Sequence, residues 1–149
     1  MALPDYVVHP DGQWDSPGIR FTELPADGPT AQFVRLFAGA YLEAARGDDY
    51  IGVQTYNTEH VGPDLQGVPR PEGTRVTQMG WTFTPEALGH SVRLAAAVTG
   101  VPVIVTENGV AADDDAERIE YYSRSLRALR AAMDAAWTCA ASRLDACWT

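Results

Sequence analysis

The chain contains no lysine, and its charge is strongly acidic. All eleven basic residues are arginines, against twenty Asp and Glu residues, which gives a formal net charge of −9. This balance disfavours nucleic acid or an anionic membrane surface as a partner. No segment approaches the roughly 20 apolar residues of a membrane span, and the first residues lack the basic and apolar regions of a secretory signal. We therefore expect a cytoplasmic protein with no nucleic-acid or membrane partner.

Cysteine and histidine are also scarce. Cys139 and Cys147 both lie near the end of the chain; a short-range disulfide is one interpretation, and a reduced intracellular pair is the favoured one. His9, His60 and His90 lie in unrelated segments, and none is assigned a role. Without a metal-ligand cluster or a phosphate-binding glycine loop, we expect no metal and no cofactor. The same absences disfavour an unrelated small α/β enzyme.

The first half of the chain reads as loop, helix, strand and loop. A length of 149 residues is enough for one domain with a modest core. Residues 1–29 are rich in Pro, Gly and Asp, which predicts a loop or a poorly ordered segment. Apolar residues recur at helical spacing over 30–45, and 50–56 is a β-branched and aromatic run of strand length. Residues 60–75 contain many glycines and prolines and predict a long surface loop.

The second half predicts a helix, a buried strand and a second helix. Thr84 is the expected cap of the first helix, and Gly100 its end. The apolar run 101–106 does not alternate, as in a strand buried on both faces of a parallel sheet. The last helix is expected from the acidic residues 113–115 to Met133. Its expected buried stripe is Ile119, Tyr122, Leu126, Leu129 and Met133. This alternation of strands and helices predicts a parallel α/β fold.

Glu107 follows the buried strand directly, in the sequence Thr-Glu-Asn-Gly. In parallel α/β folds, functional groups collect where the strands end at their carboxyl side. A carboxylate at that position costs free energy unless it is paired or used. Glu107 is therefore a candidate catalytic residue, although a glutamate at a strand end is weak evidence alone.

Four ordered motifs give the chain a more specific resemblance. They are VPVIVTENG (101–109), RGDDYIGVQTY (46–56), QMGWTFTPEAL (78–88) and RIEYYSRSLRAL (118–129). Together they resemble the region around the nucleophile of family 1 glycoside hydrolases, the β-glucosidase type. The resemblance implies a partial (β/α)8 TIM barrel, with about two βα units around strands six and seven. It also implies a β-glycoside or oligosaccharide as substrate.

The resemblance assigns roles to five residues. Glu107 would be the nucleophile that attacks the anomeric carbon in double-displacement hydrolysis, and the phenol of Tyr56 would orient it. Trp81 would line the aglycone side, where an aromatic face stacks on a ring. Gln54 stands where the family usually has asparagine, and it is placed with Asn108 among the substrate-binding residues. As plain core residues, Tyr56 and Trp81 would need no such role.

Parts of the family pattern are missing from this sequence. The family's acid/base glutamate lies in an N-E-P motif, which does not occur here. We divide the chain into residues 1–29, a partial barrel over 30–134, and an aberrant tail over 135–149 that a frameshift near Asp134 would explain. The chain is thus expected to be inactive alone. The alternative is a non-catalytic remnant, or a piece that needs a partner to complete the barrel; unpaired barrel edges favour self-association.

The acidic residues 113–115 are interpreted as a solvated helix start rather than a cation site.

Overall fold

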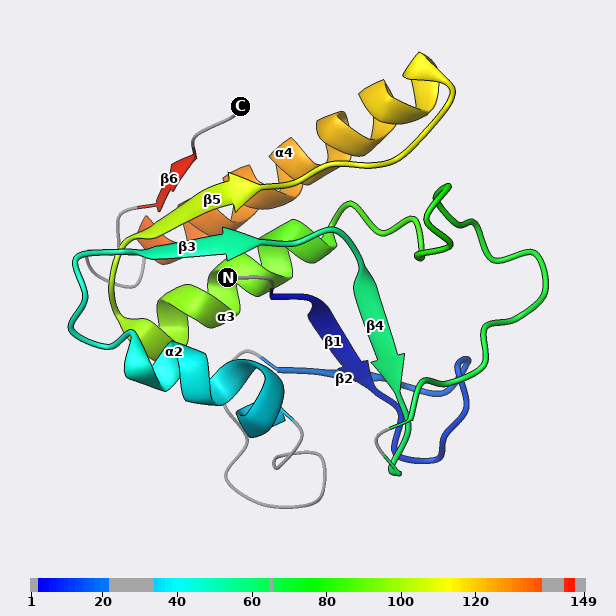
Figure 1. Ribbon diagram of the computed structural model, residues 1–149, viewed down its shortest axis with the longest axis horizontal. Helices are drawn as coiled ribbons and strands as arrows, with labels where there is room; N and C mark the ends of the chain where they lie inside the picture. Colours follow the sequence, from blue (N-terminus) through cyan, green and yellow to red (C-terminus); the bar gives the residue numbers. More distant parts are fainter. Residues whose placement is uncertain (1–2, 22–33, 65, 138–143, 147–149) are drawn as a thin grey trace.

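The computed structural model describes residues 3–21, 34–64, 66–137 and 144–146 (Figure 1). Cys139 and Cys147 fall outside these ranges, as does most of the tail. No helix in the described ranges is long and apolar enough to cross a membrane. The described residues form an open α/β arrangement of two three-stranded sheets, without a closed barrel.

The sheet that carries the nucleophile candidate is parallel, with the order β3-β5-β6. Strand β3 is Ile51–Gln54, β5 is Val103–Glu107 and β6 is Leu144–Ala146. The two strands expected from the sequence are therefore confirmed, and the tail adds a third. Val53, Val103 and Val105 are almost fully buried, as expected for β-branched residues in a covered parallel sheet.

Helices cover one side of this sheet (Figure 1). Helix α3 is Ala87–Thr99 and α4 is Asp115–Trp137; α4 thus runs one turn beyond the expected end. A π-helical turn, Arg35–Gly39, leads into α2, Ala40–Ala44, within the helix expected over 30–45. The core between sheet and helices is mainly aliphatic. Its most buried large side chains include Leu3, Leu42, Leu88, Val92 and Val53.

Helices α3 and α4 approach each other closely at Gly89. A Cβ atom added at Gly89 would lie 2.6 Å from the carbonyl oxygen of Ala128. Only a glycine leaves room for this contact between the two backbones. The C-cap Gly100 has φ 70°, in the left-handed region that glycine adopts without strain. The predicted end of α3 is thereby confirmed.

The beginning of α3 differs from the expectation. The N-cap position is Glu86, without a side-chain cap hydrogen bond. The hydroxyl of Thr84 instead accepts a hydrogen bond from the backbone N–H of Thr58 at 2.8 Å. Thr84 was therefore wrongly predicted as the cap, because a long-range backbone donor occupies its side chain.

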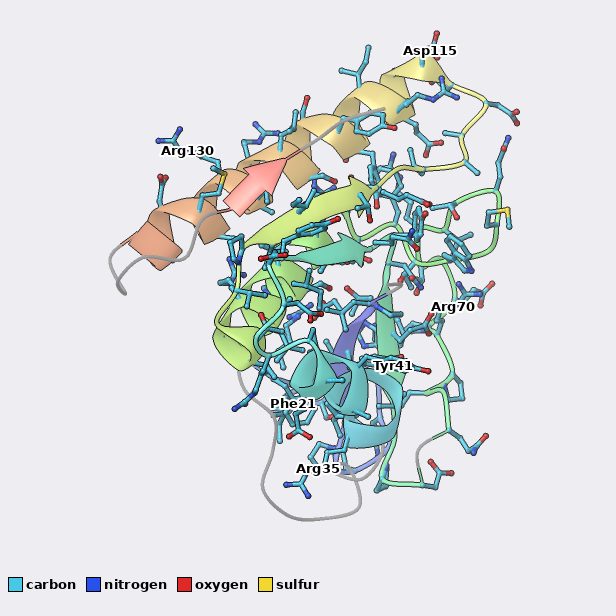
Figure 2. The ribbon with its side chains drawn as sticks, turned by 60° about the vertical axis from the view of Figure 1, so that its left-hand side comes forward. Phe21, Arg35, Tyr41, Arg70, Asp115 and Arg130 are labelled. Carbon is cyan, nitrogen blue, oxygen red and sulfur yellow. The ribbon has the colours of Figure 1, made fainter. Side chains whose placement is uncertain are left out.

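The prediction of the buried face of α4 was also partly wrong. Ile119 and Leu126 are 66% and 45% exposed. Leu129 is buried as predicted, and Tyr122 and Met133 are half-buried; the other buried side chains of the helix are Tyr121, Ser125 and Ala132. The prediction relied on large apolar residues, whereas the small Ser125 and Ala132 face the core. The hydroxyl of Ser125 donates a hydrogen bond to the carbonyl of Pro85 at 3.2 Å. The exposed Arg130 lies on the outer face of α4 (Figure 2).

A second sheet corrects part of the loop prediction over 1–29, of which residues 22–29 lie outside the described ranges. Of the described residues in the loop predicted over 60–75, only His60 and Val61 belong to a strand. Strand β1, Asp5–Val8, pairs in parallel with β4, Thr58–Val61, and antiparallel with the short β2, Ile19–Arg20. The β1–β4 pairing joins residues 53 positions apart, from Asp5↔Thr58 to Val8↔Val61. Because this partner is so distant in sequence, local composition did not reveal the strand.

Candidate active site

Glu107 is the last residue of β5, and its carboxylate is exposed at the carboxyl end of the sheet. An irregularity between Val53 and Gln54 shifts the register, so that Gln54 lies opposite Glu107. The Gln54 side-chain amide Nε2 donates a hydrogen bond to Glu107 Oε1 at 2.8 Å. The bulge thus places an amide donor directly on the candidate nucleophile.

Tyr56 occupies the other oxygen of the same carboxylate. Its phenol donates a hydrogen bond to Glu107 Oε2. Burial, the hydrogen bond to Glu107 and the negative charge of that carboxylate raise the pKa of Tyr56 to about 12. Tyr56 therefore remains a protonated donor through the neutral pH range. Both carboxylate oxygens are held by donors from the end of the neighbouring strand.

Trp81 lies beside Tyr56, which in turn contacts Glu107. The ring centroids of Tyr56 and Trp81 are 5.7 Å apart, with the rings tilted by 42°. Trp81 is 39% exposed, so part of its indole remains free to contact another ring. The structure thus brings Gln54, Tyr56, Glu107 and Trp81 together at one end of the sheet.

Asn108 faces the protein rather than the open end of the site. Its side-chain Nδ2 donates to the carbonyl of Thr55 at 2.6 Å and to the hydroxyl of Tyr121 at 3.4 Å. These contacts hold the turn after β5 against the end of β3. A contact between Asn108 and substrate stays a prediction.

The segment that carries Trp81 is a hairpin fixed to α4. Backbone hydrogen bonds join Thr77 to Trp81 and Phe83 to Arg75. The guanidinium of Arg75 lies 3.6 Å from the Phe83 ring centroid and forms ion pairs with Glu117 and Glu120 of α4. The sequence did not predict this clamp, because its partners are more than forty residues apart.

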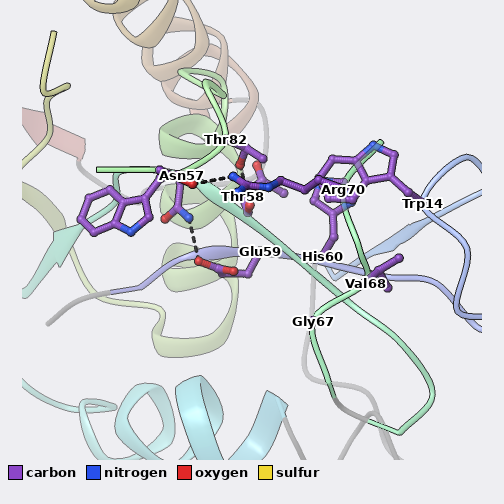
Figure 3. A pocket seen from close by; sticks show the side chains of 11 residues that line it. Trp14, Asn57, Thr58, Glu59, His60, Gly67, Val68, Arg70 and Thr82 are labelled. Atoms are coloured by element: carbon purple, nitrogen blue, oxygen red, sulfur yellow. Dashed lines mark hydrogen bonds between the residues drawn. The ribbon is translucent and has the colours of Figure 1, made fainter. Parts of the chain in front are cut away.

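A pocket of about 200 Å³ opens next to Trp81 (Figure 3). Figure 3 shows Trp14, His60 and Arg70 at one end of it and Asn57 at the other. The pocket also includes Glu59 among its lining residues. Indole faces with amide, carboxylate and guanidinium groups form a surface suited to a hydroxylated ring.

His9, His60 and Trp14 form a cluster that the sequence analysis missed. His9 Nε2 and His60 Nδ1 share a hydrogen bond of 2.8 Å, and the indole of Trp14 stacks on His60 with centroids 3.6 Å apart. The β1–β4 pairing brings the two histidines together, since Val7 and Val8 lie opposite His60 and Val61. No local sequence signal marks such a pair.

This cluster predicts a loss of stability in mild acid. Burial, together with the charges of His9 and Arg20, lowers the pKa of His60 to about 4. Because this pKa lies below the ordinary 6.5, protonation favours the unfolded chain. The stability that neutral His60 contributes is fully present above pH 6.5 and is lost as the pH drops towards 4. Because His60 is only half-buried, solvent screening reduces this loss to on the order of 1–2 kcal/mol. Thermal melts of the protein and of His60→Gln between pH 7.5 and 4.5 test this; an equal pH slope in both would contradict it.

No group of three or more potential metal-binding side chains occurs in the part of the chain that the structure describes. The acidic residues at the start of α4 make local contacts instead. Asp114 Oδ1 accepts the backbone N–H of Ala116 at 2.8 Å, and Asp115 pairs with Arg118. They act as a helix start.

Comparisons with known proteins find similar chains among the β-glucosidases. No protein-family profile matches the chain. The bifunctional β-D-glucosidase/β-D-fucosidase of Bifidobacterium breve is 38% identical over 72 residues, covering 39% of this chain and 16% of that protein. The apo structure of β-glucosidase 1317 has a TM-score of 0.69 and 35% identity, over 84% of this chain and 30% of its own. The chain is related to the β-glucosidases. The β-glycosidase BGL167 agrees, with a TM-score of 0.70 and 34% identity over 99% of this chain and 32% of its own.

The related β-glucosidases are considerably longer than this chain, which spans about a third of the solved structures and a smaller part of the curated protein. The partial α/β arrangement described above corresponds to part of their TIM barrel. The described residues thus have the fold of one part of a β-glucosidase barrel.

Proposed function

We propose that this chain carries the nucleophile side of a retaining β-glycosidase of family 1, with β3 and β5 as the sixth and seventh barrel strands. One observation carries the proposal: Gln54 and Tyr56 each donate a hydrogen bond to a different oxygen of Glu107. A carboxylate held in this way at a strand end has a fixed direction of attack. An ordinary surface glutamate has no such fixed orientation.

The reaction proceeds in two displacements. Glu107 attacks the anomeric carbon and forms a C–O bond as the glycosidic bond breaks. A second carboxylic acid, about 5–5.5 Å away, gives its proton to the departing oxygen and later removes a proton from the incoming water. Water then displaces Glu107, which returns as a carboxylate. The family supplies the second carboxyl from an N-E-P motif that does not occur in these 149 residues.

The pocket beside Trp81 supports a place for the leaving group. Trp81 lines the pocket and contacts the ring of Tyr56, so a ring stacked on Trp81 would lie next to the nucleophile. Asn57 and Glu59 offer acceptors for hydroxyl groups there; the Asn57 amide already donates to Glu59 at 2.7 Å. This arrangement favours a β-glycoside with a cyclic aglycone, such as an aryl group or a second sugar.

Turnover by the chain alone is expected to be negligible. General acid–base help contributes about 10²–10⁴ in rate, and the sugar-binding groups of the remaining barrel add more. The covalent step is less demanding when the leaving group is already acidic. We therefore expect slow labelling by 2,4-dinitrophenyl 2-deoxy-2-fluoro-β-glucoside. Intact-mass and peptide mass spectrometry should find one fluoroglucosyl group on Glu107. Label on another residue, or no label at all, would count against the proposal.

The exposed apolar surface favours a second candidate: a non-catalytic piece that assembles with another polypeptide. Ile119 and Leu126 are spaced by two helical turns on α4, and both are exposed. Exposed apolar side chains of this kind favour association.

This second candidate predicts concentration-dependent self-association. Replacing both Ile119 and Leu126 by glutamine removes apolar area and should weaken dimer formation roughly tenfold, or about 1–2 kcal/mol. Sedimentation velocity over a range of concentrations measures the change. Ala116→Gln, at an exposed position of the same helix, is the matched control. A monomer at every concentration would argue against assembly through α4.

A further inference from the structure

Tyr121 is the largest fully buried side chain of the described residues, with 0% exposure. It lies in the second turn of α4, where its ring meets Phe83 edge-on at 5.5 Å and Tyr122 at 6.1 Å. A buried tyrosine must place its hydroxyl on a partner, or the polar group loses its hydration without replacement. The position of that hydroxyl is therefore informative.

The hydroxyl of Tyr121 lies behind the candidate active site. It donates a hydrogen bond to the backbone carbonyl of Tyr56 at 2.7 Å. It also accepts a longer hydrogen bond, of 3.4 Å, from the side-chain amide of Asn108. The same Asn108 amide donates to the carbonyl of Thr55 at 2.6 Å. One phenol and one amide thus connect the chain just after β3 with the chain just after β5.

These contacts lie where regular strand pairing stops. The last paired residues are Gln54 and Glu107, followed by a backbone hydrogen bond of 3.3 Å from Thr55 to the Glu107 carbonyl. Tyr56 lies beyond the ladder, so the ladder does not fix its backbone. Its phenol nevertheless has to meet the carboxylate of Glu107 on the other strand.

We propose that Tyr121 is a positioning residue for the nucleophile: its hydroxyl holds the backbone of Tyr56 so that the Tyr56 phenol reaches Glu107. Tyr121 acts from α4: its described contacts are with the Tyr56 carbonyl, Asn108, Phe83 and Tyr122 rather than with the Glu107 carboxylate. Burial raises the pKa of Tyr121 to about 12, so its hydroxyl stays a donor at neutral pH. The catalytic meaning of this role rests on the proposed function, whereas the coupling between the two tyrosines does not.

The test is Tyr121→Phe, which keeps the buried ring and removes only the hydroxyl. Without its anchor, Tyr56 should lose part of its contact with Glu107, and its pKa should fall from about 12 by about one unit. At pH 11 a phenol with a pKa of 12 is about one-tenth ionised, and one with a pKa of 11 about half ionised. The Cζ chemical shift of ¹³C-labelled Tyr56, assigned with Tyr56→Phe, measures this fraction. Circular dichroism at the same pH checks the fold.

Two further variants make the result specific. Tyr50→Phe removes the hydroxyl of an exposed tyrosine just before β3 and should leave the pKa of Tyr56 unchanged. Asn108→Ala removes the amide that connects the Thr55 carbonyl with the Tyr121 hydroxyl, and it should lower the pKa of Tyr56 as Tyr121→Phe does. This second variant preserves the test if Tyr121→Phe folds poorly. A lower melting temperature with an unchanged Tyr56 pKa would reduce Tyr121 to a packing residue. That outcome would leave the labelling of Glu107 unaffected, so the two proposals fail separately.

Discussion

Replacing Glu107 by glutamine is expected to abolish covalent labelling by the fluorinated glycoside. The amide oxygen is a far weaker nucleophile than a carboxylate oxygen. The substitution also mismatches the site, because an amide offers one acceptor oxygen where Gln54 and Tyr56 present two donors. One donor would then face an N–H group and lose its partner. We expect at least a thousandfold loss of labelling, of the order seen when covalent nucleophiles are removed.

Three other variants separate chemistry from orientation. Tyr56→Phe and Gln54→Ala each remove one donor and should slow labelling by about tenfold to a hundredfold, since a misplaced carboxylate still reacts. Glu43→Gln changes an exposed carboxylate on α2 that does not line the pocket and should leave the rate near that of the unaltered protein. Intact-mass time courses give all four rates. Persistence of the label in Glu107→Gln would overturn the assignment of the nucleophile.

Gly89→Ala should cause the largest loss of stability for the smallest added group. The new methyl would lie 2.6 Å from the Ala128 carbonyl oxygen and 2.9 Å from its carbon. Both atoms belong to the backbone of α4 and cannot rotate away, so the two helices must separate. Overpacking of this kind costs about 1–3 kcal/mol or more, which exceeds the gain of about 1 kcal/mol from alanine in a helix. The melting temperature should fall by about 3–8 °C.

Gly67→Ala is the matched control for this change. Gly67 is exposed, and among the described residues an added methyl would meet only the His60 carbonyl at 4.0 Å. The same substitution should therefore leave stability within about 0.5 kcal/mol. Urea denaturation followed by circular dichroism compares the two. A Gly89→Ala protein as stable as Gly67→Ala would show that α3 and α4 do not pack at this distance.

The central part of the fold could be predicted from the sequence because its signals are local. The apolar segment 101–106 and the strand 50–56 have the composition of buried strands, and Gly100 marks the helix end between them. The resemblance to family 1 glycoside hydrolases implied that the Tyr56 phenol orients Glu107. The structure brings them into hydrogen-bond contact.

The features that escaped prediction depend on distant partners. Strand β1 exists only because β4 lies beside it, and the pairing of His9 with His60 follows from that alignment. The inward face of α4 was misjudged because Ser125 is buried through a hydrogen bond to Pro85, which hydrophobicity does not anticipate. The second contact of the Glu107 carboxylate, with Gln54, required the register shift at Val53. None of these could be read from a single segment.

The pairing of β3 with β5, joined by α3 and supported from behind by Tyr121, has a consequence for engineering. Every hydrogen bond described to the Glu107 carboxylate comes from within the segment that begins at Ile51. Tyr121, whose hydroxyl binds the Tyr56 carbonyl, lies only 14 residues after Glu107. A continuous stretch of fewer than eighty residues therefore contains both the reacting group and the parts that aim it. Such a stretch could be moved as one cassette between barrels that differ elsewhere, carrying its alignment with it.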